Sequence, residues 1–427
     1  MNSRMVRLFG TSGVRRKVGE LSDGFAYDLG RAVGSSVKTG VAVGRDTRES
    51  GPRLQAAFVS GLTASGRDVV MLGVVPTPTV GVAAAEVGSG VVVTASHNPP
   101  DYNGFKLFNR RGAFTPREEG RVEAAFTGGR FIQGKGLVSE ADYVGRHIRL
   151  ILECVGEVGG VRVLLDCAGG AGSVVTPCLL GEMGCVASVI NDRRDGVFPH
   201  PLEPTAGNLE GTCAIVKKAG VDIGFAHDGD ADRTCAISGD GVLIEWDTFL
   251  TVLASQYDKV VTTVDASMRI EEFCRKVYRV PVGDVAVSEG IRRHKAGFGG
   301  EPSGTHIFPD VHIFPDGVAT VAKAAKLVAD GVFYKLVGEI PSYPMERLKI
   351  PCPEARKETA MANIRKMLSG RDFSDIDGIR VAEDDGWILI RPSGTEEYMR
   401  ITAEGKTKER LDSLLKAGRE WVGRAML

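Results

Sequence analysis

Three segments of this 427-residue chain repeat one order of predicted elements: an apolar strand that ends at an aspartate, a helix, and two further strands. The first strands close at Asp46, Asp166 and Asp265, and helices are predicted over 53–65, 174–183 and 270–277. Strands that alternate with helices pair in parallel and bury both faces of their sheet. The order therefore predicts three similar mixed α/β domains, although the residues of the three segments differ.

The third strand of each segment runs into a polar loop, and these loops carry most of the unusual residues. They span 94–97 (Thr-Ala-Ser-His), 228–233 (Asp-Gly-Asp-Ala-Asp-Arg) and 300–304 (Gly-Glu-Pro-Ser-Gly). Open α/β sheets bind ligands beyond the carboxyl ends of their strands. We expect the three loops to face one central cleft; the alternative is that the three domains stack without sharing a site.

The character of the chain changes after residues 340–344 (Ile-Pro-Ser-Tyr-Pro), which are typical of a linker. A small α+β domain is predicted beyond it, with strands over 347–350, 379–381, 387–390 and 399–403 and helices over 354–368 and from Lys408. Because 427 residues exceed what a single core holds, several domains are expected. We place them at 1–153, 154–245, 246–341 and 342–427.

Composition excludes several classes of function. A formal charge of −1 with 25% charged residues gives no overall field that would attract nucleic acid or an anionic membrane. No apolar run approaches the length of a membrane span and no signal sequence is recognisable, so a cytoplasmic location is expected. The eight cysteines form no C-x-x-C pair, which favours reduced, buried thiols.

The turn at 94–100 places one hydroxyl, that of Ser96, directly after a run of apolar residues over 90–93. Pro99 and Pro100 force the chain out of extended structure, so the Ser96 side chain is expected at the carboxyl edge of a sheet. Such a hydroxyl suits a nucleophile. A capped turn without chemistry is the alternative for this motif alone.

Asp228, Asp230 and Asp232 alternate along a loop after a buried strand, so their carboxylates can converge on one hard cation. Mg²⁺ fits, since it takes few carboxylates and completes its shell with water or phosphate oxygens. A calcium EF-hand is excluded, because Arg233 and Gly239 occupy its sixth and twelfth positions. A solvated acidic turn remains the alternative.

Two further groups suit phosphate. Residues 391–395 (Arg-Pro-Ser-Gly-Thr) offer a guanidinium, two hydroxyls and open backbone amides, and Arg400 follows on the next strand; a plain hairpin turn is the alternative. Arg15, at the end of a Gly-flanked loop, and Lys106 could flank a phosphorylated serine, although a single lysine is by default a solvated residue.

Four motifs together make the chain resemble the α-D-phosphohexomutases over nearly its whole length. In order, they are Phe-Gly-Thr-Ser-Gly-Val-Arg (9–15) with Thr-Ala-Ser-His-Asn-Pro-Pro (94–100), then 228–233, 300–304 and 391–395. The resemblance implies three similar α/β domains and a smaller α+β domain, similar to the TATA-box-binding protein, around a central cleft. This agrees with the repeated order of elements.

The resemblance also implies roles for individual residues. Ser96 matches the phosphoserine that donates and recovers a phosphoryl group. Asp228, Asp230 and Asp232 match the Mg²⁺ ligands, with a Ser96 phosphate oxygen completing the site. The other implied roles are sugar hydroxyl binding by Glu301 and Ser303, distal phosphate binding by Arg391, Ser393, Gly394 and Thr395 with Arg400 beside them, and contact with the reacting phosphoryl group by Arg15, His97, Lys106 and Arg233. No role is transferred to His306, because many members have histidine directly after the glycine, where this chain has Thr305.

The activity implied is phosphoryl movement between the 6- and 1-positions of a hexose phosphate through a sugar bisphosphate, which also charges the serine. Residues 282–287 and Pro302 resemble the glucosamine-phosphate members, so conversion of glucosamine 6-phosphate to glucosamine 1-phosphate is the leading expectation. Residues 98–106 instead resemble the mannose and glucose enzymes. Two other classes compete: a phosphatase with Asp228 as nucleophile, and a sugar-phosphate sensor without catalysis. The oligomeric state is not predicted.

Overall fold

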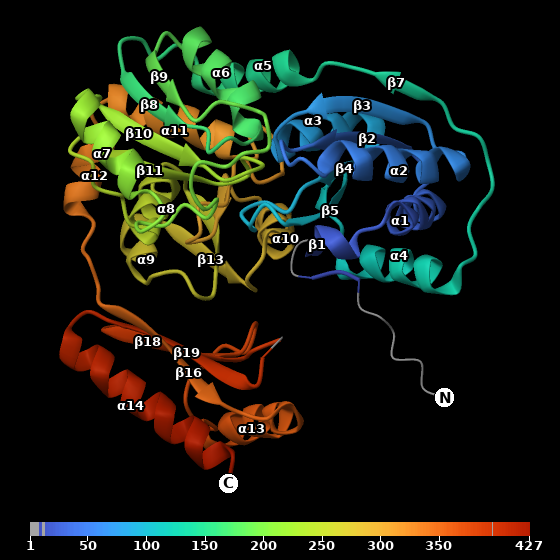
Figure 1. Cartoon of the computed structure of the whole chain (residues 1–427). Coiled ribbons are helices and arrows are strands. Elements are labelled where there is room, and N and C mark those ends of the chain that lie inside the picture. Colours follow the sequence, from blue (N-terminus) through green and yellow to red (C-terminus); the bar gives the residue numbers. More distant parts are fainter. Residues whose placement is uncertain (1–7, 11–12, 395) are drawn as a thin grey trace. The chain divides into compact units, whose positions relative to one another are not determined.

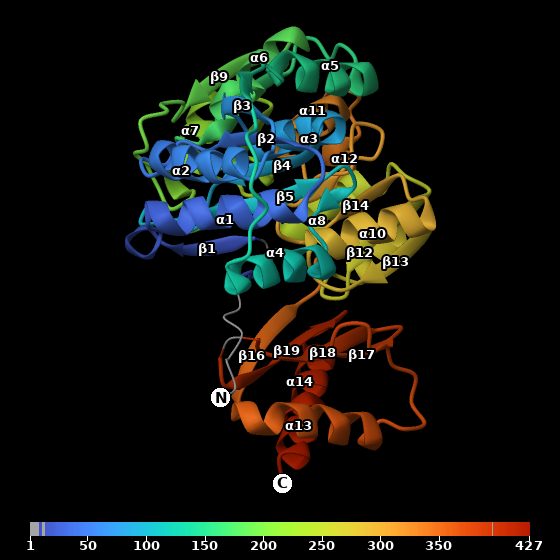
Figure 2. The same ribbon diagram turned by 90° about the vertical axis from the view of Figure 1, so that its right-hand side faces the viewer.

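The computed structural model describes residues 8–10, 13–394 and 396–427 (Figures 1 and 2). The chain divides into two compact units. The first runs to Phe249 and includes Ser303–Lys335; the second contains Leu250–Pro302 and Leu336–Leu427.

A mixed sheet begins the first unit, with strand order β1-β5-β4-β2-β3-β7 and β6 paired to β5. Its strands are β1 (Val14–Lys17), β2 (Gly40–Arg45), β3 (Val69–Val74), β4 (Gly88–Val93), β5 (Tyr102–Asn109), β6 (Gly112–Ala113) and β7 (Val138–Glu140). β2 pairs in parallel with both β3 and β4, and β5 lies antiparallel to β4 and β1. The central strand is therefore the one that precedes Asp46, as the sequence predicts.

Helices cover both faces of this sheet. They are α1 (Asp23–Ser36), α2 (Gly51–Ala64), α3 (Thr77–Val87) and α4 (Pro116–Gly128), with the 3₁₀ turn η1 (Val18–Glu20). Because side chains alternate along a strand, Val41 and Val43 pack into one core with α1, α2 and α4, and Ala42 packs into a second core with α3. The two cores fix the sheet between two helical layers.

A second sheet of the first unit has the order β11-β10-β8-β9. Its strands are β8 (Arg162–Asp166), β9 (Val186–Ile190), β10 (Ile223–His227) and β11 (Thr234–Ser238). This part of the chain also holds helices α5 (Val144–Val155), α6 (Thr176–Glu182), α7 (Glu210–Ala219) and α11 (Gly317–Ala329), the turn η2 (Ala171–Val174) and strand β15 (His306–Ile307). Helices α8 (Trp246–Ala254) and α12 (Phe333–Glu339) begin in the first unit and end in the second. β8 lies in parallel between β9 and β10, and β11 runs antiparallel to β10.

The second unit repeats the arrangement, with β12 (Lys259–Thr263) in parallel between β13 (Lys276–Val280) and β14 (Phe298–Gly300). The helices are α9 (Arg269–Phe273) and α10 (Asp284–His294). The predicted order of elements is confirmed in all three segments. The helix predicted over 270–277 is wrong at its end, because α9 stops at Phe273 and Val277 already pairs with Val260 in the sheet.

The C-terminal part of the second unit is an antiparallel sheet covered on one face by two helices (Figure 2). The elements are β16 (Met345–Pro351), α13 (Glu354–Met367), β17 (Ile379–Glu383), β18 (Gly386–Pro392), β19 (Tyr398–Gly405) and α14 (Lys408–Ala425), with strand order β16-β19-β18-β17. Ile388, Ile390 and Ile401 pack against Ile364 of α13 and Leu411 of α14. The predicted α+β domain is confirmed.

The structure also bears on two expectations from the sequence, that the cysteines are reduced and buried and that no segment spans a membrane. All eight cysteines lie in described segments and are free; Cys167, Cys235, Cys274 and Cys352 are buried, whereas Cys178 is exposed. Among the helices that the structure describes, none is long and apolar enough to cross a membrane.

Helices α1 and α2 pack through two glycines. A Cβ atom added to Gly30 would lie 2.2 Å from the Phe58 carbonyl oxygen, and one added to Gly61 would lie 2.0 Å from that of Tyr27. Neither carbonyl can move without moving its helix, so the close packing of the two helices depends on these residues having no side chain.

We expect Gly30→Ala to lower the free energy of unfolding by about 2 kcal/mol or more, because the added methyl group overpacks a backbone contact. Gly24→Ala is the matched control on the same helix. Its added Cβ meets no atom closer than 3.8 Å, so helix propensity should leave stability equal or about 0.5 kcal/mol higher. Urea unfolding measures both, and equal losses would contradict the packing argument.

Candidate active site

Ser96 lies in the loop that follows β4, and its side chain is buried. Its backbone has φ +53°, a left-handed conformation that residues other than glycine seldom adopt. The hydroxyl of Thr94 accepts a hydrogen bond from the Ser96 N–H (2.8 Å) and donates one to Asp46 Oδ2 (2.6 Å). The aspartate that closes β2 therefore helps to hold the serine in this conformation.

Arg48 is a residue that the sequence analysis missed, and it organises the serine loop. Its side chain is 1% exposed. The guanidinium donates to Asp46 Oδ2 (3.0 Å) and to four loop carbonyls, those of Ser96 (2.9 Å), Asn98 (2.6 Å), Pro99 (2.6 Å) and Tyr102 (2.9 Å). The only signal in the sequence is its position two residues after the strand-closing aspartate.

The loop between β10 and β11 gathers the three predicted aspartates. One carboxylate oxygen from each of Asp228, Asp230 and Asp232 lies within 4.8 Å of the others, and all three residues are buried. Ala231 has φ +53°, so this loop also turns through a left-handed residue. A Cβ at Gly229 would lie 2.7 Å from the Ser96 carbonyl oxygen, which shows how closely the two loops approach.

Side-chain contacts connect the two loops. Ser96 Oγ donates to Asp228 Oδ2 at 2.7 Å. Lys106, on β5, donates to Asp230 Oδ2 (2.7 Å) and to Asp232 Oδ2. Thr77, the first residue of α3, donates its hydroxyl to Asp230 as well. The structure thus brings together the predicted serine, the three predicted aspartates and the predicted lysine.

The charged groups of this cluster shift one another's pKa values. Burial raises the pKa of Asp228, and the neighbouring carboxylates of Asp232 and Asp230 raise it further. Burial alone would raise the pKa of Asp230, but the charge and hydrogen bond of Lys106 outweigh it and hold that pKa below its usual range. Burial lowers the pKa of Lys106, whereas Asp230 and Asp232 raise it by more, so the ammonium stays charged.

The three aspartates fit a divalent cation. Asp230 Oδ1 and Asp232 Oδ1 are buried and have no hydrogen-bond partner among the described residues. A buried carboxylate oxygen without a partner is costly, and a hard cation satisfies it directly. The donor set consists of oxygen atoms alone. Such donors suit Mg²⁺, Ca²⁺ and Mn²⁺ better than they suit softer metal ions.

Three further predicted positions, two arginines and a histidine, lie near this cluster. Arg15, on β1, donates to Asn98 Oδ1 (3.0 Å), and Arg233 donates its backbone N–H to Asp228 Oδ1 (3.3 Å). His97 Nδ1 lies 3.4 Å from Ser96 Oγ. Burial, with the charges of Arg233, Arg15 and Lys106, lowers the pKa of His97 to about 3, so its imidazole is neutral beside the serine.

The remaining predicted residues divide between the two units. Ser303 belongs to the first unit, and Glu301, Arg391, Ser393, Gly394 and Arg400 belong to the second; Thr395, like Thr11 and Ser12 of the first motif, lies outside the described residues. The expected common cleft therefore stays a prediction. His306 is fully buried against Phe249, with ring centroids 5.3 Å apart, and burial lowers its pKa to about 3.

The second unit holds the predicted phosphate-binding arginines. Arg391 and Arg400 lie directly opposite each other on β18 and β19, a pairing of like charges that an anion would relieve. Arg391 pairs with Asp377 at 2.8 Å, and Asp377 also accepts the backbone N–H of Val282 at 2.9 Å. Among the described residues other than its chain neighbours, none places an atom within 4 Å of a Cβ built on Gly394.

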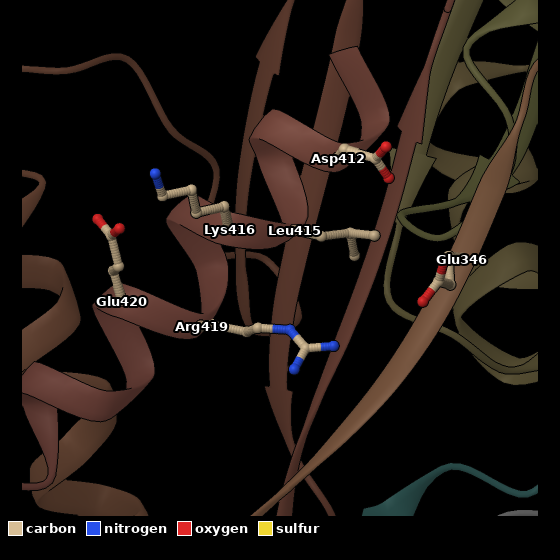
Figure 3. A pocket seen from close by; sticks show the side chains of 6 residues that line it. All are labelled: Glu346, Asp412, Leu415, Lys416, Arg419 and Glu420. Atoms are coloured by element: carbon tan, nitrogen blue, oxygen red, sulfur yellow. The ribbon is translucent and has the colours of Figure 1, made fainter. Parts of the chain in front are cut away.

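A hollow of about 420 Å³ also lies on the second unit, between α14 and β16 (Figure 3). Its lining residues are Glu346, Asp412, Leu415, Lys416, Arg419 and Glu420. The side chains of Lys416 and Glu420 point away from β16, whereas Arg419 points toward it. Three acidic residues, two basic residues and one leucine line this hollow, and none of them is a predicted site residue.

Comparison with known proteins covers almost the whole chain. Four family models match in order: Phosphoglucomutase/phosphomannomutase, alpha/beta/alpha domain I (residues 6–133), domain II (146–241) and domain III (239–342), and the C-terminal domain (348–420).

Individual relatives agree with the family models. A probable phosphoglucosamine mutase from Methanopyrus kandleri is 42% identical over 96% of each chain, and one from Pyrococcus abyssi is 40% identical over 98% of each. A solved phosphoglucomutase/phosphomannomutase family protein from Burkholderia thailandensis has a TM-score of 0.90 and 28% identity, and the match covers 100% of this chain and 98% of that one.

We expect Arg48→Lys to lower the free energy of unfolding by about 3 kcal/mol, because an ammonium cannot replace a planar fork and leaves buried carbonyls unpaired. Arg53→Lys is the control, since Arg53 is 44% exposed and its ion pair with Asp23 should contribute less than about 1 kcal/mol. Urea unfolding measures both losses. Hydrogen exchange should show reduced protection of the 96–104 amides in Arg48→Lys alone; an unchanged loop would refute the role of Arg48.

Proposed function

Because the chain belongs to the α-D-phosphohexomutase superfamily, we propose that it is a phosphoglucosamine mutase, which converts glucosamine 6-phosphate to glucosamine 1-phosphate. Relatives that are 38–42% identical over nearly their full length carry that name, which favours the amino sugar over mannose and glucose phosphates. Phosphomannomutase or phosphoglucomutase activity is the second candidate, supported by residues 98–106.

The observation that carries the reaction class is the 2.7 Å hydrogen bond between Ser96 Oγ and Asp228 within a buried cluster of carboxylates and cations. In the proposed cycle, the phosphoryl group of phosphorylated Ser96 passes to the free hydroxyl of the sugar monophosphate. The resulting bisphosphate reverses its orientation in the site and returns its other phosphoryl group to Ser96. A trace of sugar bisphosphate charges the serine at the start.

This chain's own residues supply positioning and charge for that transfer. Phosphoryl transfer needs these more than covalent assistance. Asp228, Asp230 and Asp232 would hold Mg²⁺, which neutralises charge on the phosphoryl oxygens when it is bound. A phosphoserine carries roughly −2 at neutral pH, so Arg15 and Lys106 beside it stabilise the charged enzyme.

Substrate binding falls to the remaining predicted residues. We propose that Glu301 and Ser303 bind sugar hydroxyls, and that Arg391, Ser393, Gly394 and Thr395, with Arg400, bind the phosphate that is not reacting. The opposed arginines support the second assignment. Because the sugar reverses its orientation between the two half-reactions, this phosphate site must accept either end of the bisphosphate.

The substrate assignment is tested by initial mutase rates on glucosamine 6-phosphate, mannose 1-phosphate and glucose 1-phosphate, with Mg²⁺ and trace sugar bisphosphate. We expect kcat/KM to be at least about tenfold higher for the amino sugar, a difference of about 1.4 kcal/mol in transition-state binding. A preference for mannose or glucose would overturn the substrate and leave the reaction class in place.

The reaction class is tested by Ser96→Ala. We expect it to lower the mutase rate by on the order of 10³-fold or more and to abolish incorporation of labelled phosphate, because the nucleophile is lost. Ser60→Ala, an exposed hydroxyl on α2, is the control and should retain both. Full turnover by Ser96→Ala with loss in Asp228→Asn would indicate the phosphatase instead. Ligand-dependent thermal stabilisation without product or phosphoserine would indicate a sensor.

A further inference from the structure

A buried group of two histidines and an aspartate lies outside the cluster of aspartates described above. His147 (α5) and Asp316, which directly precedes α11, are fully buried, and the His312 side chain is 7% exposed. His147 Nε2 bonds to Asp316 Oδ2 at 2.9 Å, and His312 Nε2 lies 2.9 Å from the same oxygen. None of these residues has a part in the proposed cycle.

The hydrogen bonds around this group argue against a second metal centre. His312 Nδ1 accepts the Phe314 N–H at 3.2 Å, so its Nε2 carries the proton and has no lone pair for a metal. Asp316 Oδ1 is already used, since it accepts the Ala319 N–H (2.9 Å) as the N-cap of α11. The group is therefore a carboxylate that His147 holds by a hydrogen bond at the start of a helix, with His312 close to the same oxygen.

The residue after Asp316 touches the loop of residues 228–233, which carries the three aspartates and is called the metal-binding loop below. Gly317 donates its N–H to the Ala231 carbonyl (3.1 Å), and its own carbonyl accepts the Thr234 hydroxyl (2.9 Å). A Cβ on Gly317 would lie 2.6 Å from the Arg233 carbonyl oxygen and 2.8 Å from that of Ala231. The start of α11 thus packs against the backbone that carries the three aspartates.

Helix α3 contacts both His147 and the metal-binding loop. Thr79 bonds to His147 Nδ1 at 2.9 Å, on the ring atom opposite the one that holds Asp316. Two residues earlier, Thr77 donates its backbone N–H to the Asp230 carbonyl at 2.9 Å and its hydroxyl to the Asp230 carboxylate. α3 therefore reaches the metal-binding loop directly through Thr77 and indirectly through His147.

We propose that His147 is a positioning residue for the metal-binding loop. It fixes Asp316, which sets the place of Gly317 and so supports the left-handed turn at Ala231 between two of the carboxylates. The inference rests on the proposed function in one respect, that Asp228, Asp230 and Asp232 bind a divalent cation.

The test is the dissociation constant of Mn²⁺, measured by electron paramagnetic resonance titration of the folded full-length protein in the absence of sugar phosphate. We expect His147→Gln to weaken Mn²⁺ binding about three- to tenfold, less than the roughly 10–100-fold that loss of a direct partner of a metal ligand costs, because His147 acts through Asp316 and Gly317. Ile151→Val is the control on the same face of α5. It is also fully buried and lies one helical turn away, and it should leave the constant unchanged.

A second variant guards against a His147→Gln protein that does not fold. Thr79→Val removes only the hydroxyl that orients the imidazole, and it should weaken Mn²⁺ binding in the same direction by about twofold or more. Equal Mn²⁺ constants for wild type, Thr79→Val and every folded His147 variant would overturn the proposal, as would a bound zinc ion that is lost with His147. Failure of the wild-type protein to bind Mn²⁺ would overturn the cation site itself, and this inference with it.

Discussion

The buried ion pair between Asp46 and Arg48 is the interaction on which the rest of the site depends. One guanidinium gathers four carbonyls that would otherwise point at one another, and the paired carboxylate fixes Thr94 beneath the serine. Buried charges are tolerated when every donor and acceptor is satisfied, and this pair meets that condition through backbone atoms. The left-handed conformation of Ser96 therefore rests on contacts that lie beneath the loop, away from the reacting atom.

The balance of charge around the three aspartates allows the site to accept ligands of either charge. Burial and the repulsion of the neighbouring carboxylates together raise the pKa of Asp228, and the charge of Lys106 offsets part of that repulsion. A phosphoryl group and a divalent cation bring charges of both signs, which the same residues can accommodate. The neutral imidazole of His97 adds a polar contact without adding charge.

Much of the fold could be predicted because apolar runs mark strands regardless of their partners. The order around β2, β8 and β12 and the antiparallel C-terminal sheet follow from that pattern. The helix predicted through Val277 failed because β-branched residues there favour the sheet. Arg48 and Thr77 could not be predicted, since the partners that bury a polar side chain are decided by tertiary packing. The four domain boundaries and the common cleft remain predictions.

The glycine between Asp228 and Asp230 has a consequence for how this reaction can vary among sequences. Position 229 sits against the Ser96 carbonyl, where even one methyl group would push the two loops apart. The reach of the serine oxygen to its carboxylate partner is thus set by a hydrogen atom in place of a side chain. A larger residue at position 229 would therefore separate Ser96 from Asp228, whatever ligand the two loops bind.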